Sequence, residues 1–404
     1  MSAQTTEAVV IGAGPYGLSV AAHLQGRGVR TRIFGTPMSF WQRMPASINL
    51  KSFAWATNVA VPRRRFTYPE YCRAHGLPDL EPCTMKSFAD YGVWVQQALV
   101  PELEQTDVAE VIGPPGRHGD YEVRLATGET VRTRSVIVAT GLSNFARLPD
   151  ALANLPRELV SHTAEHTTFG HFAGKDVAVV GAGASALEAA TLVLEAGGRP
   201  LLLARDAEVI FHGRFDPGRS LHEKWKHPNS SLGPGRKSWV LQHFPLLVHY
   251  LPEAPRVRFA HNYLGPSGPW WLIARFKDKV PYRVRTTVTR SAARGGKVEL
   301  ELLEGGQPAR TMTFDHVIAG TGYVVDVDAL PFLSRPLRAS IERVEKSPAL
   351  SRHFESSVPR LYFVGPSAAL SFGPLFRFVT GASVAAPRVA RHVSRTVRRR
   401  SSRS

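Results

Sequence analysis

The chain has 404 residues, 43 % of them hydrophobic, and a formal net charge of +17. This length allows two or three domains, each with its own core. No apolar run approaches the roughly 20 residues of a membrane-spanning helix, and residues 1–7 lack the basic and then apolar character of a signal peptide. We therefore expect a cytoplasmic protein without a membrane partner.

The two cysteines, Cys72 and Cys83, form no C-x-x-C motif and are not flanked by residues with metal-ligand spacing. The sequence thus predicts neither a metal site nor a redox-active disulfide.

The positive charge is concentrated partly in a basic C-terminal tail, residues 388–404. This tail contains Arg388, Arg391, Arg395, Arg398, Arg399, Arg400 and Arg403. No helix-turn-helix, zinc-finger or single-strand-binding motif accompanies the charge. We therefore expect attraction of a polyanionic cofactor or an anionic substrate rather than nucleic acid.

The first βαβ unit is predicted over residues 6–35, with strands at 7–11 and 30–34 and a helix at 18–26. A glycine turn before the helix lets the backbone close on a pyrophosphate at the positive helix N-terminus. The cofactor-binding residues expected here are Gly12, Gly14, Pro15, Tyr16 and Gly17.

The segment after this unit is unusual in two ways. Gly35 stands where such units carry an acidic residue that binds the adenosine ribose, so the ribose contact must come from elsewhere. The aromatic loop 37–44 is placed to cover the cofactor, and we expect Trp41 to contact it. A later apolar strand, 135–139, is expected to return to the first sheet and to bring Thr140 and Gly141 to the cofactor.

A second nucleotide unit runs from residue 175 to about residue 205. Its turn contains Gly181, Gly183, Ser185 and Ala186, the last being a tolerated variant of the third glycine. Arg205 follows the second strand, where an arginine can bind the 2′-phosphate of NADP. We therefore favour NADPH over NADH.

The rest of the chain suggests how the two units are connected. Residues 206–281 are irregular and form either a lid or a docking surface, because structureless loops of that size are uncommon. Residues 316–323 repeat the pattern of strand and small-residue turn. If the strand at 361–365 completes the first sheet, the second unit is inserted in the first.

We accordingly expect an α/β fold with two Rossmann-like dinucleotide-binding domains. The expected division is an FAD-binding domain (1–170 and 315–387), an NADPH-binding domain (171–314) with the lid-like insert 206–281, and the basic tail 388–404. Two such sites on one chain suggest hydride transfer from NADPH to FAD.

The whole chain resembles the two-dinucleotide-binding-domain flavoproteins. Within them it is similar to the NADPH-dependent flavin monooxygenases, which include flavin-containing monooxygenases, amino-acid N-hydroxylases and bacterial FAD-dependent urate hydroxylases. The resemblance rests on both glycine turns and on Phe40-Trp41, Leu50-Lys51-Ser52, Ala139-Thr140-Gly141, Gly320-Thr321-Gly322-Tyr323 and the segment 373–379.

The resemblance implies that NADPH reduces FAD and that O2 adds to the flavin as a C4a-(hydro)peroxyflavin. One oxygen atom then enters a small nitrogen-containing substrate, by N-hydroxylation or urate-type ring hydroxylation. It also implies cofactor contacts from Gly322, Tyr323, Gly373 and Phe376. Asn49, Lys51 and Trp271 are the catalytic candidates, the first two as polar groups facing flavin or substrate and the third as part of an aromatic wall.

Two other functions stay open at this point. One is an NADPH-dependent flavoprotein reductase that passes electrons to a partner. The other is a non-catalytic flavoprotein that senses redox state or associates with nucleic acid through the arginine tail. A homo-oligomer also stays open.

Overall fold

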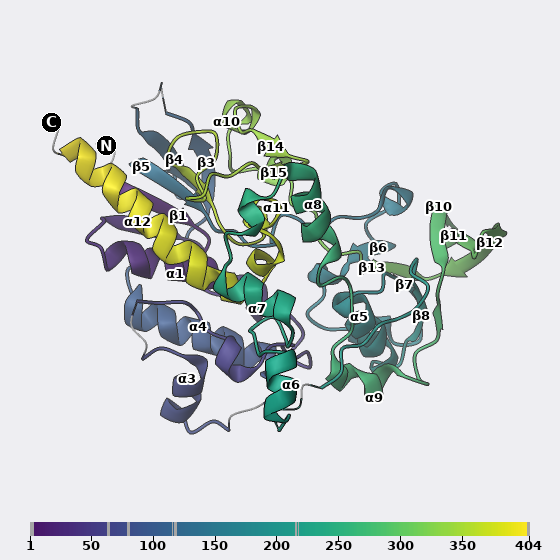
Figure 1. The fold of residues 1–404 in the computed structure, drawn as a ribbon. Coiled ribbons are helices and arrows are strands. Elements are labelled where there is room, and N and C mark those ends of the chain that lie inside the picture. The colour runs from purple at the N-terminus through teal and green to yellow at the C-terminus, as the bar shows by residue number, and fades with distance from the viewer. Residues whose placement is uncertain are drawn as a thin grey trace.

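The computed structural model describes residues 4–401 apart from 63, 64, 79, 80, 115, 117, 118, 215 and 217. It consists of two α/β lobes (Figure 1). The first lobe contains both ends of the described chain, and the second lobe is built around helix α5 and a separate sheet. Residues 402–404 of the predicted tail lie outside the described residues.

The first lobe is organised around a mixed sheet. Its strands run in the order β2 (Thr31–Phe34), β1 (Gln4–Ile11), β5 (Thr130–Val138), β4 (Tyr121–Leu125) and β3 (Val108–Ile112), and β16 (Leu361–Phe363) also pairs with β5. The pairs that β1 makes with β2 and β5 are parallel, as is the β5–β16 pair. Because β16 comes late in the chain, the chain leaves this sheet and returns to it, as the insertion hypothesis expected.

The second lobe contains a parallel sheet. Its order is β6 (Val160–His162), β13 (His316–Ala319), β7 (Asp176–Val180), β8 (Arg199–Leu203) and β9 (Tyr282–Arg283). An antiparallel sheet follows, with β10 (Thr286–Arg294), β11 (Lys297–Glu304) and β12 (Gln307–Phe314). Strands β6 and β13 lie outside the expected bounds of 171 and 314, so the pairing favours a wider insert, and the domain division itself stays a prediction.

The helices cover these sheets. Helix α1 (Pro15–Gln25) packs against the long C-terminal helix α12 (Ala382–Ser401), and α5 (Ala184–Glu195) packs on β7 and β8 (Figure 1). The remaining α-helices of the first lobe are α2 (Ser39–Gln42), α3 (Tyr68–Ala74), α4 (Met85–Leu99), α10 (Arg335–Ala339) and α11 (Ala369–Phe372). A two-stranded sheet of β14 (Arg343–Val344) and β15 (Ser347–Pro348) lies between α10 and β16 in the chain.

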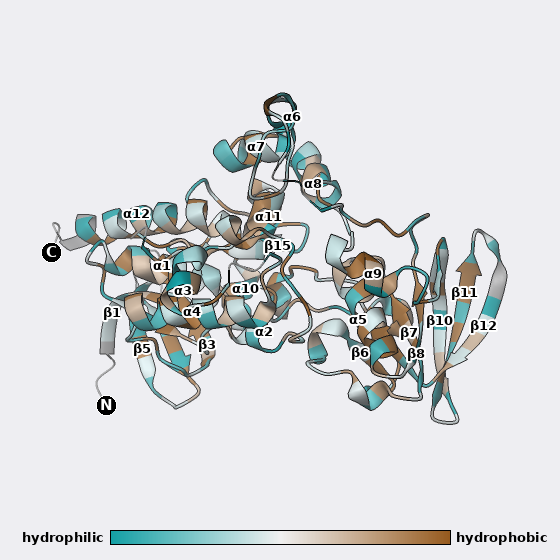
Figure 2. Cartoon of the chain, turned by 90° about the horizontal axis from the view of Figure 1, so that it is seen from below, coloured by the Kyte–Doolittle hydropathy of each residue, from teal (hydrophilic) through white to brown (hydrophobic). Residues whose placement is uncertain are grey.

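The expected insert 206–281 is partly helical, with irregular segments between its helices. It contains α6 (Leu221–Lys226), α7 (Arg236–His243), α8 (Glu253–Asn262) and α9 (Ile273–Phe276). Although it follows the second nucleotide unit in the chain, α8 packs against α11 of the first lobe. The Arg256 guanidinium donates to the carbonyl of Leu370 at 3.0 Å. Helices α6 and α7 project from the body of the molecule (Figure 2).

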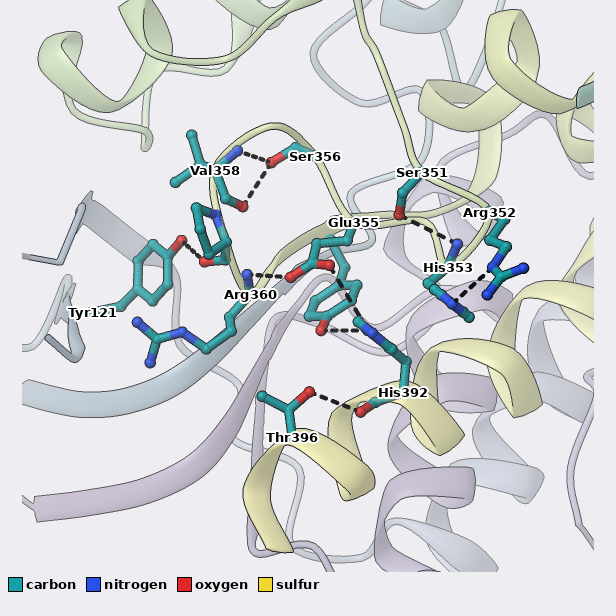
Figure 3. Close-up of polar contacts among 12 residues, drawn as sticks. Tyr121, Ser351, Arg352, His353, Glu355, Ser356, Val358, Arg360, His392 and Thr396 are labelled. Carbon is teal, nitrogen blue, oxygen red and sulfur yellow. Dashed lines mark hydrogen bonds and ion pairs between the residues drawn. The ribbon is translucent and has the colours of Figure 1, made fainter. Parts of the chain in front are cut away.

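The returning strand β16 is held by a polar network beside α12 (Figure 3). The Tyr121 hydroxyl of β4 donates to the carbonyl of Pro359 at 2.7 Å. The carboxylate of Glu355 accepts from the backbone N–H of Arg360 at 2.7 Å and lies 3.9 Å from His392 Nδ1. These contacts fix where the chain rejoins the first sheet.

Two connections join the lobes, and they run side by side. Residues 139–159 lead from β5 to β6, and residues 320–360 lead from β13 back to β16. The N–H of Val324 donates to the Phe145 carbonyl at 2.9 Å, and Thr321 Oγ1 donates to the Arg147 carbonyl at 3.0 Å. Ala146 and Tyr323 form an antiparallel bridge between them.

Candidate active site

The first glycine turn has the geometry of a pyrophosphate site. Gly12 has φ +105°, and a Cβ there would lie 2.6 Å from the Ala139 carbonyl oxygen. A Cβ at Gly17 would lie 1.8 Å from the carbonyl oxygen of Gly12, whereas a Cβ at Gly14 would meet nothing within 4 Å. Gly14 thus leaves open space at the N-terminus of α1, where backbone N–H groups bind phosphate. The turn fits the dinucleotide expected there.

Gly35 is explained by its backbone conformation. Its φ is +125°, and a Cβ would sit 3.5 Å from the backbone nitrogen of Ala13. A residue with a side chain would be strained there, so the ribose-binding acid has no place at this position.

Tyr16 and Phe376 contact one another and do not face the open space beside Gly14. The Tyr16 hydroxyl lies 3.0 Å from the Phe376 carbonyl oxygen and 2.8 Å from that of Phe378. Gly373 faces the insert, because a Cβ there would lie 3.0 Å from Val248. These three residues therefore join the turn, the insert and the segment before α12, and their contact with cofactor stays a prediction.

The second glycine turn repeats the close packing of the first. A Cβ at Gly181 would lie 2.3 Å from the Gly320 carbonyl oxygen, and one at Gly320 would lie 2.5 Å from Ala186 Cβ. Gly320, at the end of β13, thus makes the room that Ala186 needs as the third residue of the motif. Gly183 precedes α5 without a side-chain cap, which leaves the helix N-terminus free for phosphate.

Arg205 follows β8 and is exposed. No ion pair of Arg205 is present in the described part of the chain, so its guanidinium is free to bind an anion such as a 2′-phosphate. Thr140 and Gly141 follow β5 beside the first turn, where the Ala139 N–H donates to the Ile11 carbonyl at 2.8 Å.

A cleft with a cavity volume of about 210 Å3 lies between the lobes. Two of the predicted site residues, Ser185 and Tyr323, line it. Its other walls come from separate segments and include Phe40, Met44, Leu142, Thr163, His166, Phe169 and Glu188. Beside it, His162 Nε2 lies 3.0 Å from the carbonyl oxygen of Gly322, and its ring lies 5.2 Å from that of Tyr323. Because Ala164 N–H donates to His162 Nδ1 at 3.1 Å, Nε2 carries the hydrogen and donates.

The structure does not bring every candidate to this cleft. Trp41 packs edge-on against Phe88 with ring centroids 4.8 Å apart, and the backbone of Asn49 pairs with Thr84. Neither residue lines the cleft, so their roles stay predictions. The indole N–H of Trp271 is buried and has no hydrogen-bond partner among the described residues. Trp271 does not line the cleft either, so its catalytic role also stays a prediction.

Lys51 and Glu188 influence one another electrostatically across the lobes, although no ion pair between them is present among the described residues. Lys51 Nζ donates to the backbone carbonyl of Ser267, in the loop before α9. Burial raises the pKa of Glu188 to about 8, and Lys51 and Arg275 partly oppose this. Burial also lowers the pKa of Lys51, while Glu188 opposes that shift. Glu188 is 8 % exposed, and its raised pKa marks it as a candidate functional residue.

Glu188 was missed at the level of sequence, although a signal exists. It is the only charged residue of α5 before the final Glu195, in an otherwise alanine- and leucine-rich helix. An acid among apolar residues on a buried helix needs a partner or a function. His162 and His166 were also missing from the predicted site, because only the folded chain brings their segments together, whereas Phe40 belongs to the loop that was expected to cover the cofactor.

Comparison with known proteins identifies the family. Residues 9–224 match the family of pyridine nucleotide-disulphide oxidoreductases, and the chain belongs to it. The chain is 29 % identical over 332 residues to the indole-3-pyruvate monooxygenase YUCCA1 of Oryza sativa subsp. japonica, a match that covers 79 % of this chain and 69 % of the relative. It is 23 % identical over 438 residues to an FAD-dependent urate hydroxylase of Xanthomonas campestris pv. campestris, which covers 96 % and 85 %.

The fold also resembles that of solved flavoenzymes. An ornithine N-hydroxylase of Kutzneria sp. 744, solved with reduced FAD, NADP+ and L-ornithine, superposes with a TM-score of 0.76 at 17 % identity. That match covers 97 % of this chain and 99 % of the hydroxylase. The likeness confirms the predicted α/β fold with two dinucleotide-binding units.

The predicted class is confirmed as well. The chain is a flavoprotein monooxygenase, an oxidoreductase. Its two cysteines are free and buried. Among the described residues, no group of three or more His, Cys, Asp or Glu side chains could hold a metal ion, and no helix is long and apolar enough to cross a bilayer.

Proposed function

We propose that this monooxygenase oxygenates a small nitrogen-containing molecule in the cleft between the lobes. The observation that carries this proposal is the cleft itself, which has about 210 Å3 and is lined by residues of both nucleotide-binding units. Drug-sized ligands need roughly 300–1,000 Å3. The cleft therefore suits a single ring system or a short chain. The Glu188 carboxyl in its wall can hydrogen-bond an N–H group.

The relatives support a nitrogen-containing substrate. The names of the rice and Xanthomonas enzymes give indole-3-pyruvate and urate, both nitrogen heterocycles, as what those proteins act on. For this chain we keep N-hydroxylation and ring hydroxylation as the two outcomes of the chemistry.

The chain's own residues would bind the cofactors and exclude water. FAD would lie at the turn with Gly12, Gly14 and Gly17, and NADPH at the turn with Gly181 and Gly183. When bound, FAD accepts hydride from NADPH and activates O2. The apolar cleft walls Phe40, Met44, Leu142 and Phe169 would keep water from the reacting atoms.

Four further roles belong to this proposal. Trp271 would donate its free indole N–H to the bound molecules, Lys51 would hold the loop at Ser267 closed, and Asn49 would support the same loop region from the first lobe. Arg205 would bind the 2′-phosphate of NADPH. A cytoplasmic location, the lack of a nucleic-acid partner and the oligomeric state remain predictions.

The test is to measure NADPH oxidation, O2 consumption and product with the purified FAD-loaded enzyme. Candidates would include indole-3-pyruvate, urate and basic amino acids, each beside an isosteric analogue without the nitrogen. We expect one nitrogen-containing compound to give hydroxylated product in proportion to NADPH. NADPH-driven reduction of an artificial electron carrier, with no hydroxylated product from any candidate, would instead favour the reductase function. An Arg205→Ser variant should raise KM for NADPH by on the order of tenfold and leave KM for NADH nearly unchanged.

A further inference from the structure

The insert between β8 and β9 exposes an unusual amount of apolar surface. Six large side chains in and after α6 and α7 are between 41 % and 85 % exposed, namely Leu221, Trp225, Phe244, Leu247, Tyr250 and Leu251. We call these six residues the apolar patch. Clusters of this kind on a folded domain mark an interaction site.

The patch has a firm base. His249 Nδ1 lies 3.1 Å from the Ser371 carbonyl oxygen, and Arg256 donates to Leu370 as described above. The Arg236 guanidinium lies 5.1 Å from the centre of the Trp225 ring and so connects α7 to α6. The inner side of the insert is thus attached to the first lobe, while its outer side projects from the molecule (Figure 2).

Exposed cations outnumber the exposed carboxylates of Glu223 and Glu253 near the patch. Lys226, Arg236 and Lys237 are exposed within the insert. On α12, Arg391, Arg395 and Arg398 are also exposed, and their spacing of four and three residues places them on one face of the helix. We call these three residues the arginine row. Arg388, one turn before the row, is close enough to Tyr250 of the patch for the two side chains to interact electrostatically.

We infer that the apolar patch and the arginine row together form a docking face for the anionic surface of a lipid bilayer. Trp, Tyr, Phe and Leu side chains enter the interface between headgroups and acyl chains, and flanking Lys and Arg bind anionic headgroups. A second copy of the chain is a poor occupant, because a symmetric contact would bring two positively charged faces together.

This contact is peripheral. It is compatible with the lack of a membrane-spanning helix among the described residues, and it departs from the expectation that the chain has no membrane partner. Of the two roles that the sequence allowed for residues 206–281, a lid or a docking surface, this proposal favours the docking surface.

The test uses the full-length, FAD-loaded enzyme and sedimentation with lipid vesicles. One set of vesicles is phosphatidylcholine alone, and the other is equal parts phosphatidylcholine and phosphatidylglycerol. We expect stronger binding to the anionic vesicles, by on the order of tenfold, and weaker binding as salt is raised. The variant Trp225→Gln/Phe244→Gln should lose binding severalfold. The variant Arg391→Glu/Arg395→Glu should lose it by on the order of tenfold.

Matched controls come from the far sheets of the second lobe. Tyr282→Gln removes an exposed aromatic ring and Arg290→Glu reverses an exposed charge, and both should bind vesicles like the wild type. NADPH oxidation without vesicles should be the same for all variants, which shows that they are folded. Equal binding to both vesicle types, or full binding by both double variants, overturns the proposal. So does a dimer in light scattering that Trp225→Gln/Phe244→Gln separates, because the patch would then be a contact between copies.

Discussion

Glu188 is held in a setting that disfavours its charge. The unfolded chain would ionise this carboxyl near pH 4.3, whereas burial raises its pKa to about 8 in the folded chain. Between these values the folded state binds more protons than the unfolded state. The contribution to stability is therefore complete below about pH 4.3 and is lost as the pH rises through about 8.

Replacing Glu188 by glutamine should remove this loss, because the amide is neutral at every pH. We expect the stability of Glu188→Gln relative to the wild type to rise by about 1–3 kcal/mol between pH 5 and pH 8. Urea unfolding of both apoproteins at the two pH values measures this difference. Glu208→Gln, at an exposed carboxylate with no ion pair among the described residues, should keep the pH dependence of the wild type. A difference between Glu188→Gln and the wild type that does not change with pH would contradict the prediction.

At the scale of an element, the turn between β1 and α1 contains one glycine that the fold requires and another that the cofactor requires. A Cβ at Gly17 would clash with the Gly12 carbonyl oxygen, while a Cβ at Gly14 would meet no protein atom within 4 Å. Gly17→Ala should therefore destabilise the apoprotein by about 2 kcal/mol or more. Gly14→Ala should change its stability by less than about 1 kcal/mol yet weaken FAD binding by on the order of tenfold.

Thermal unfolding of the apoproteins and titration with FAD, followed by flavin absorbance, measure the two effects. If Gly14→Ala loses as much stability as Gly17→Ala, then Gly14 is needed for the fold rather than for the phosphate.

Elements of this kind were predictable because their signals are local. Each strand, glycine turn and helix of the two nucleotide units lies within about 30 residues, and the residue spacing alone indicates it. The cleft is different, since Phe40, Leu142, His166 and Glu188 come from four separate segments. Their meeting depends on how the two lobes are placed. Trp41 shows the same limit, because its packing on Phe88 of α4 is a long-range contact that its own loop does not reveal.

At the scale of the whole molecule, Lys51 connects the lobes through its bond to the Ser267 carbonyl. Without that bond the loop before α9 would be less firmly held, and water would enter the site more easily. We expect Lys51→Met to divert NADPH oxidation from product to hydrogen peroxide, with severalfold more peroxide per NADPH. Ser267→Ala is the matched control, because it keeps the backbone carbonyl. If peroxide rises equally in both variants, the bond from Lys51 to that carbonyl is not what closes the site.

The paired connections between the lobes restrict how the molecule can move. A single linker would leave the second lobe free to swivel, but two antiparallel segments bonded at Phe145 and Val324 resist twisting and sliding. The insert is bonded to the first lobe through His249 and Arg256 as well, so a hinge motion at the paired connections would also have to shift or break these contacts. Ala146 and Tyr323 belong both to this hinge and to the cleft wall, so each bend would also reshape the space in which the substrate is held.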